Sequence, residues 1–265
     1  MTIAGYLAVV LVGISLGLIG GGGSILTLPI LVYLFGVSPT VGTGYSLFIV
    51  GVAAAFGAFQ YARQKLVNYK IGLIFALPAF LGVFLARKFI VPSLPDTIFE
   101  GQSFAFSKDT LIMMAFGVMM LAAAFSMIKG RKDTGLDDTQ VQTPPLLLTV
   151  AEGLIVGAIT GFVGAGGGFL IIPALVVLAK LPMKMAVGTS LMIIAIKSIF
   201  GFAGDITSGP PIEWAFLGLL TATALVGILV GSSLVKKIPG DKLKPAFGWF
   251  VLVMGGFVIT MQLIR

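Results

Sequence analysis

An apolar segment broken by four consecutive glycines occurs near the start of the chain, and a related segment with three consecutive glycines occurs in its second half. Residues 17–35 read GLIGGGGSILTLPILVYLF, and residues 161–179 read GFVGAGGGFLIIPALVVLA, at an offset of 144. The match continues downstream, and over residues 17–50 and 161–194 it gives 13 identities in 34 positions. Self-similarity at a fixed offset indicates an internal duplication. The chain is therefore expected to fold as two related halves.

The surroundings of these segments are those of a membrane protein. Hydrophobic residues make up 58% of the chain and charged residues 10%, and the mean hydropathy is +1.11. Several apolar runs are long enough to span a bilayer as helices, and no polar interval is long enough for a soluble domain. We expect a first membrane repeat at 1–128, a cytoplasmic linker at 129–145 and a second membrane repeat at 146–265.

Each half is expected to contain one glycine-broken segment and three ordinary spans. Glycine costs about 1 kcal/mol relative to alanine inside a helix, and lipid offers no partner to backbone groups freed from a helix. The segments at 5–35 and 147–179 could each be one long tilted span or a hairpin that returns to the side it entered from. The ordinary spans are predicted at 43–62, 71–91, 110–128, 186–204, 213–235 and 246–264.

The positions of Lys and Arg distinguish these two models, because both residues accumulate in cytoplasmic loops. If the broken segments cross once, the two sides hold seven and nine of these residues, which is no bias. If the segments double back, twelve lie on one side and four on the other. The twelve are Arg63, Lys65, Lys70, Lys129, Arg131, Lys132, Lys180, Lys184, Lys236, Lys237, Lys242 and Lys244, and the four are Arg87, Lys88, Lys108 and Arg265. The asymmetry favours hairpins, either re-entrant or short double passes.

Hairpins leave three full crossings in each half, an odd number, so the halves would face opposite ways across the membrane. Inverted repeats with discontinuous helices that meet near the midplane are a common plan of secondary transporters. The predicted fold is all-α integral membrane, with two inverted repeats, each a glycine-broken helical hairpin plus three transmembrane helices. Both termini and the loop at 92–108 are expected outside.

The glycines at the hairpin tips are predicted to bind an anion. A helix that starts inside the membrane presents unpaired N–H groups and the positive end of its dipole, and glycine lets the backbone approach a ligand. The alternative is close helix packing, which we expect for Gly153, Gly157, Gly161, Gly227 and Gly231. The expected lining residues are Gly20, Gly21, Gly22, Gly23 and Ser24 in the first half, and Gly164, Gly166, Gly167 and Gly168 in the second.

Further polar residues are candidates for the same site. Hydroxyls at the start of the spans after the hairpins could face the anion or cap those helices; they belong to Thr43, Tyr45, Ser46, Thr189 and Ser190. Gln60 and Asp205 lie near span ends, where solvated polar residues are ordinary. Because the chain contains no His, Glu152 is the best-placed carboxylate for proton coupling.

Lys197 lies about 16 Å into its span at 1.5 Å per helical residue. An ammonium near the centre of a membrane helix costs about 2.5–3.5 kcal/mol on insertion scales, so it needs a partner or a wet cavity. Lys197 is expected to supply the fixed positive charge for the anion, and snorkelling to the outer headgroups is the alternative. Its counterpart in the first half is Ala53, so this charge is not part of the duplicated pattern.

The paired motifs carry a resemblance to a known family. The segments GLIGGGGS…P and GFVGAGGG…P, the downstream GTGYS and VGTSL, and VNY and IEW ahead of the third spans resemble the sulfite exporter TauE/SafE family. The resemblance covers nearly the whole chain and implies an inner-membrane carrier for small anions, often sulfite or organosulfonates. The first half has TGYS where the second has VGTS, so the two halves need not play equal roles.

The expected function is a secondary transporter, an exporter, of a small anion such as sulfite or another sulfur oxyanion, with possible proton coupling and alternating access at the tips. An anion channel of the same fold is the alternative. An enzyme is not expected, because the chain has no His or Cys, no paired acids on one helix and no phosphate-binding loop. The expected partners are the anion and the bilayer, without nucleic acid, cofactor or metal, in a monomer or homodimer.

Overall fold

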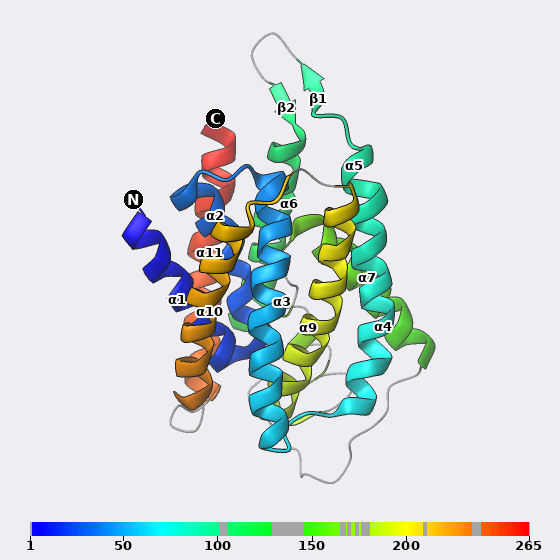
Figure 1. The fold of residues 1–265 in the computed structure, drawn as a ribbon, viewed down its shortest axis with the longest axis vertical. Helices are drawn as coiled ribbons and strands as arrows, with labels where there is room; N and C mark the ends of the chain where they lie inside the picture. Colours follow the sequence, from blue (N-terminus) through cyan, green and yellow to red (C-terminus); the bar gives the residue numbers. More distant parts are fainter. Residues whose placement is uncertain are drawn as a thin grey trace.

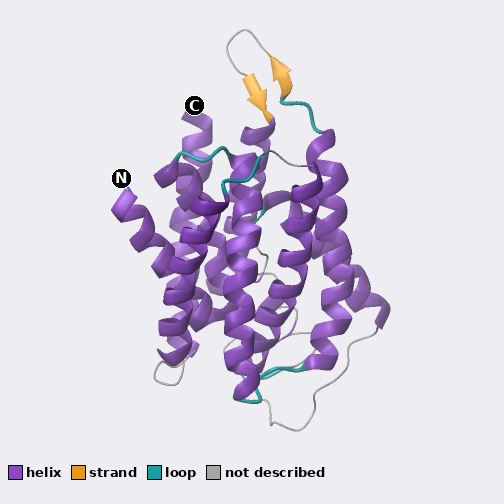
Figure 2. Cartoon of the chain, viewed as in Figure 1, coloured by secondary structure: helices purple, strands orange, loops and turns teal. Residues whose placement is uncertain are grey.

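The computed structural model describes residues 2–100, 105–128, 146–164, 168, 171, 172, 175, 181–208, 211–234 and 240–264. Helices make up nearly all of this part of the chain (Figure 2). The longer helices are α1 (Thr2–Ile19), α2 (Thr27–Phe35), α3 (Pro39–Arg63), α4 (Tyr69–Leu85), α6 (Lys108–Ile128), α7 (Leu146–Val163), α9 (Met183–Ser208), α10 (Trp214–Leu234) and α11 (Gly240–Ile264).

The predicted all-α membrane fold is confirmed in its class. Among the described residues, four helices are long and apolar enough to cross a membrane: Pro39–Arg63, Tyr69–Ser93, Lys184–Ile206 and Trp214–Leu234. Each coincides with an expected span, and α6 and α11 cover the remaining two. Large apolar side chains such as Phe59, Leu77 and Trp249 point away from the helix bundle, as contact with lipid requires.

Residues 2–35 form a hairpin, as the charge distribution predicts. Helix α1 is followed by a 3-10 helix, η1 (Gly20–Leu26), and α2 then runs back along α1. The two ends of the segment meet, because the rings of Tyr6 and Phe35 pack edge to face with centroids 5.4 Å apart. The reversal begins at Gly20, whose φ of +71° favours glycine. Pro29 lies in the first turn of α2, where its missing N–H costs little.

The second predicted hairpin is described only in part. Its first arm is α7, and Gly164 follows with the same φ of +71° as Gly20. Gly168, Ile171, Ile172 and Leu175 are then placed individually and are buried. The rest of the return arm lies outside the described residues, as does the expected linker at 129–145.

The first arm of each hairpin packs against a span of the other half through glycine. A Cβ added to Gly13 or Gly17 of α1 would overlap the backbone of α10, and one added to Gly227 would overlap that of α1. In the same way, Gly157 of α7 lies directly on the backbone of α4. The packing interpretation of Gly153, Gly157, Gly161, Gly227 and Gly231 is confirmed, because each lies within contact distance of a neighbouring helix.

Helices α3 and α9 form the centre of the bundle and run in opposite directions (Figure 1). Helix α6 packs against α11 beside this pair. Both chain ends lie at the same end of the molecule as a short antiparallel ribbon, β1 (Thr97–Glu100) and β2 (Ala105–Ser107) (Figure 1). The sequence did not predict this ribbon, because the segment before α6 carries no turn signal strong enough to separate strand from loop.

Candidate functional site

The two glycine turns lie against the first third of the two central helices. A Cβ on Gly20 would lie 2.9 Å from Ser190 Oγ and 3.0 Å from Val187 Cγ1, both in α9. A Cβ on Gly164 would overlap Thr43 of α3. Val187 is the repeat counterpart of Thr43, so each turn contacts the equivalent position of the opposite half. Each hairpin therefore reaches past the midpoint of the bundle before it turns.

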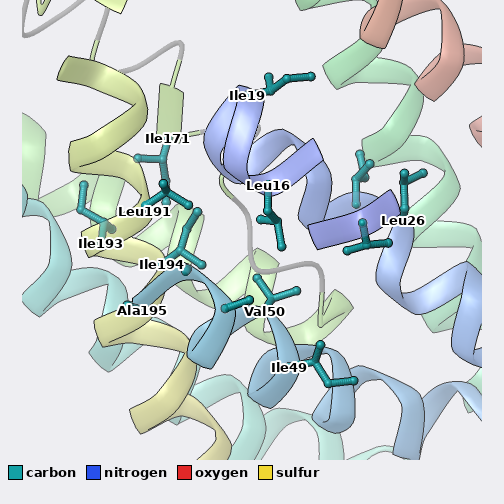
Figure 3. Close-up of a cluster of buried hydrophobic side chains, with 14 of the residues drawn as sticks. Leu16, Ile19, Leu26, Ile49, Val50, Ile171, Leu191, Ile193, Ile194 and Ala195 are labelled. Atoms are coloured by element: carbon teal, nitrogen blue, oxygen red, sulfur yellow. The ribbon is translucent and has the colours of Figure 1, made fainter. Parts of the chain in front are cut away.

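Just beyond these turns, the two hairpins touch. A Cβ added to Gly21 would overlap the backbone of Gly168, and the reverse is also true. Either added atom would also approach the Ile194 side chain, at 2.6 Å and 2.5 Å respectively. Figure 3 shows apolar side chains gathered around this point, among them Leu16 and Val50. The predicted approach of the two tips is therefore present, in a tightly packed and largely apolar environment.

The hydroxyl groups near the tips differ in their hydrogen bonds. Ser24 donates to Gly21 O at 2.6 Å, and Ser190 donates to Val187 O at 2.8 Å, both within a single helical turn. Four other buried hydroxyl oxygens have no partner among the described residues: Thr27 Oγ1, Tyr33 Oη, Ser46 Oγ and Ser198 Oγ. Unpartnered hydroxyls of this kind can donate to a bound anion.

Tyr45 and Thr189 are directed away from the tips. The Tyr45 hydroxyl accepts a bond from Glu213 N at 2.8 Å, and Thr189 Oγ1 accepts one from Asn68 N at 2.9 Å. Asn68 lies just before α4 and Glu213 just before α10, so each hydroxyl binds the start of a span in the opposite half. These two hydroxyls therefore bind the backbone ahead of another span, which is neither the capping of their own helices nor an anion-facing position.

Lys197 is completely buried in the middle of α9. Its Nζ donates to Thr160 Oγ1 of α7 at 2.8 Å, and no carboxylate pairs with it among the described residues. The side chain therefore does not snorkel to the membrane surface. Lys197 lies three residues beyond Ile194, which contacts both tips, so it projects from the same face of α9.

Arg87 was misplaced by the sequence prediction, which counted it among the loop charges. It is 3% exposed and lies in a π-helical turn, η2 (Ala86–Ile90), that extends α4 toward α5 (Val91–Ser93). Its guanidinium binds Asp205 Oδ1 through Nε at 2.7 Å and through Nη2 at 2.6 Å, and donates from Nη1 to Thr43 Oγ1 at 2.6 Å. Asp205 is likewise buried, not solvated as its place near the span end suggested. A π-helical turn inside an α-helix is frequent at functional sites.

The remaining candidates are located as follows. Gly22 and Gly23 lie within η1, and Gly23 packs against Ser15 of α1. Gly166 and Gly167 fall outside the described residues. Glu152 lies in α7 at intermediate exposure. Gln60 accepts a hydrogen bond from Ser232 of α10, so it too is drawn into the bundle.

Comparison with known proteins defines the class of this chain. A probable membrane transporter protein of Xylella fastidiosa is 30% identical over 255 residues, which are 94% of this chain and 91% of the relative. The probable membrane transporter protein MJ0441 of Methanocaldococcus jannaschii is 32% identical over 75% of this chain and 70% of its own length. The corresponding protein YunE of Bacillus subtilis is 28% identical over 88% and 89%. No solved structure matches.

The chain is accordingly a multi-pass membrane transporter. It belongs to the sulfite exporter TauE/SafE family, whose model matches residues 6–258. The resemblance carried by the paired glycine motifs is thus confirmed, and family membership implies transport rather than catalysis.

Proposed function

We propose that this protein is a secondary transporter of a small anion, sulfite or a related organosulfonate or sulfur oxyanion, which binds between the hairpin tips and Lys197. The buried ammonium of Lys197, which has no carboxylate partner among the described residues, is the observation that carries the proposal. A buried cation without an opposite charge is costly, on the order of several kcal/mol. A bound anion would remove that cost, so the site is suited to negative charge.

Three kinds of donor near the tips support an oxyanion in particular. Lys197 offers N–H groups beyond the one bonded to Thr160, since an ammonium has three. The hydroxyls of Ser46 and Ser198 are buried and unpartnered, and Thr27 adds another. The third kind is the backbone N–H groups of the tip glycines, which carry no side chain of their own. An oxyanion with several acceptor oxygens can use donors from many directions, which an apolar solute cannot.

We further propose that the halves are inverted repeats that give alternating access to this site. The opposite directions of α3 and α9 support this proposal. So does the reciprocal packing between the halves, in which α1 contacts α10 and α7 contacts α4. Movement of one half against the other would open the site to each side in turn. Export from the cytoplasm, across the inner membrane, is the proposed physiological direction.

Flux measurements in proteoliposomes test this function and separate a carrier from a channel. Radiolabelled sulfite uptake should saturate with concentration, and unlabelled sulfite trapped inside should accelerate it by exchange. Sulfate and methanesulfonate serve as competitors. Flux that rises linearly and shows no exchange acceleration would favour the anion channel, and no flux of any of the three anions would overturn the proposal.

Replacing Gly21 with valine is expected to abolish sulfite flux while the protein still inserts. A branched side chain would overlap the backbone of Gly168 and hold the tips apart. Size-exclusion profiles and flux should be measured on the same preparation. Gly218→Val is the matched control, because a Cβ at Gly218 meets nothing within 4 Å. Full activity of Gly21→Val would mean that close contact between the two tips is not required for transport.

The proposed orientation predicts opposite labelling of the two ends of the bundle. The chain contains no native Cys, so single replacements react without background. Thr97→Cys, at the exposed ribbon beside the chain ends, should react with an impermeant maleimide in intact cells. Gln64→Cys, in the exposed turn after α3, should react only after permeabilisation. The reverse pattern would place both termini in the cytoplasm.

A further inference from the structure

We propose that Asp205 carries the coupling proton of this transporter, taking up one proton when a substrate anion displaces it from Arg87. This inference rests on the proposed function. It identifies the proton as the coupling ion, Asp205 as the residue that takes it up and Arg87 as the residue that binds the anion. The pair lies at the end of the bundle that holds β1 and β2 and connects elements of the two halves, with Arg87 in η2 and Asp205 near the end of α9.

The geometry of the pair leaves one carboxylate oxygen without a partner. Asp205 Oδ1 takes both contacts from Arg87, at 2.7 Å from Nε and 2.6 Å from Nη2. Asp205 Oδ2 is buried and has no hydrogen-bond partner among the described residues. It faces Gly44 of α3, where an added Cβ would lie 2.7 Å away. A buried oxygen with no donor is where a proton would sit if the carboxyl became neutral.

The pair also lies next to the second hairpin tip. Arg87 Nη1 donates to Thr43 Oγ1, and the turn at Gly164 packs directly on Thr43. Asp205 is eight residues beyond Lys197 in α9, about 12 Å along the helix. An anion that moves between Lys197 and this end of the bundle therefore passes along one face of α9 and arrives at the guanidinium.

Charge balance links the anion to the proton. With the site empty, Arg87 and Asp205 together are neutral, which is the arrangement that burial favours. If an anion took the place of Asp205 at Arg87 while that carboxylate stayed ionised, the groups at Arg87, which lie about 12 Å along α9 from Lys197, would hold a net negative charge. Protonation of Asp205 restores neutrality, because a neighbouring like charge and burial both favour the neutral carboxylic acid. Anion and proton therefore bind together, and each raises the affinity for the other.

The other charged and titratable groups around the pair do not replace Asp205 in this role. From α3 the nearby groups are Thr43, which does not titrate, and Tyr45, which is bonded to Glu213 N ahead of α10. From η2, Lys88 is exposed and lies over the rings of Phe84 and Phe89. On α9 itself, Lys197 is bonded to Thr160. Among the described residues, Asp205 is therefore the acid in contact with a buried cation.

At the opposite end of the bundle, the positions equivalent to Arg87 and Asp205 hold no ion pair. The repeat counterparts of Arg87 and Asp205 are Ser232 and Tyr61, at the offsets of 145 and 144 that align their spans. Ser232 is bonded within α10 and to Gln60, and the Tyr61 hydroxyl donates to Gly17 O at 3.1 Å. The equivalent positions thus hold no second pair, so the inference assigns the proposed transport cycle one protonation step, at Asp205.

The wild-type protein provides the first test. Methanesulfonate keeps one negative charge across the neutral pH range, so any pH dependence of its binding comes from the protein. Its affinity should rise by about tenfold per pH unit as the pH falls, until Asp205 is protonated in the empty protein. In proteoliposomes loaded with a pH-sensitive dye, one proton should enter with each methanesulfonate, and flux should not respond to a potassium–valinomycin potential.

Asp205→Asn provides the second test, with Asp109→Asn as the matched control. Asp109 is a partly buried carboxylate that accepts bonds from the backbone N and the Oγ1 of Thr40, and among the described residues no Arg pairs with it. Asp205→Asn should bind methanesulfonate with a pH-independent affinity and should carry exchange without proton movement. Asp109→Asn should keep the wild-type slope. Glu152→Gln should also keep it, since the proton resides on Asp205.

The outcomes separate this inference from the proposed function. No flux of sulfite, sulfate or methanesulfonate overturns the proposed function and the inference with it. Saturable flux without proton movement in the wild-type protein overturns the inference alone, and this result does not depend on whether Asp205→Asn folds. Loss of proton coupling in Glu152→Gln with coupling retained in Asp205→Asn would also overturn it, in favour of Glu152.

Discussion

Replacing Lys197 with glutamine is expected to weaken anion binding by about ten- to a hundredfold, the loss of a charge-assisted hydrogen bond at a buried site. Glutamine removes the charge and keeps a polar end, one atom closer to the backbone than Lys197 Nζ, which contacts Thr160 Oγ1 at 2.8 Å. The melting temperature of the empty protein should stay the same or rise, because the substitution removes a buried charge that lacks a carboxylate partner. Sulfite binding and thermal unfolding should be measured on the same detergent-solubilised preparation.

Lys184→Gln is the matched control for this prediction. Lys184 lies in the same helix, α9, but is exposed at its beginning. Its replacement should alter neither anion affinity nor melting temperature. If Lys197→Gln binds sulfite with wild-type affinity, the ammonium is a structural link between α9 and α7 rather than part of the anion site.

Replacing Arg87 with glutamine is expected to destabilise the protein by about 3–5 kcal/mol, the cost of leaving one partner of a buried ion pair uncompensated. Asp205 would lose its guanidinium partner and could become neutral in its buried position only by taking up a proton. The double variant Arg87→Gln/Asp205→Asn should recover most of that loss, because both charges are then absent. Thermal unfolding of the wild-type protein, the two single variants and the double variant gives the coupling free energy directly.

Arg63→Gln is the matched control for the ion pair. Arg63 is an exposed arginine at the end of α3, where it lies over the Phe59 ring with no carboxylate partner among the described residues. Its replacement should change stability by less than about 1 kcal/mol. Additive losses in Arg87→Gln and Asp205→Asn, with no recovery in the double variant, would mean that the two side chains do not depend on each other.

The helices and the first hairpin could be predicted from the sequence because each follows from a local pattern. Apolar runs give the spans within a few residues, as with 43–62 against Pro39–Arg63. The glycine run marks the reversal at Gly20 because few other residues adopt its positive φ. The repeat then transfers the same expectation to Gly164.

The surroundings of Arg87 could not be predicted in this way. A charge near the end of an apolar run is ordinarily solvated, and its burial depends on a partner 118 residues away in sequence. The internal repeat gives no help, because the counterparts of the pair are Ser232 and Tyr61. The directions of hydroxyls such as Tyr45 and Ser46 likewise depend on which distant backbone groups approach them. Residue type alone therefore cannot decide whether such a hydroxyl faces the anion or caps a helix.

The packing of each hairpin on the opposite half has a consequence for how this protein is made. The glycine face of α1 is covered by α10, which leaves the ribosome among the last helices. During synthesis the glycine face of α1 is therefore exposed to lipid until α10 has been inserted. The face of α4 that packs on α7 is likewise exposed until α7 has been inserted. Assembly can be completed only when the second half has been inserted. A chain truncated before α10 should consequently be a substrate for membrane quality-control proteases, although each of its first helices can still insert into the membrane.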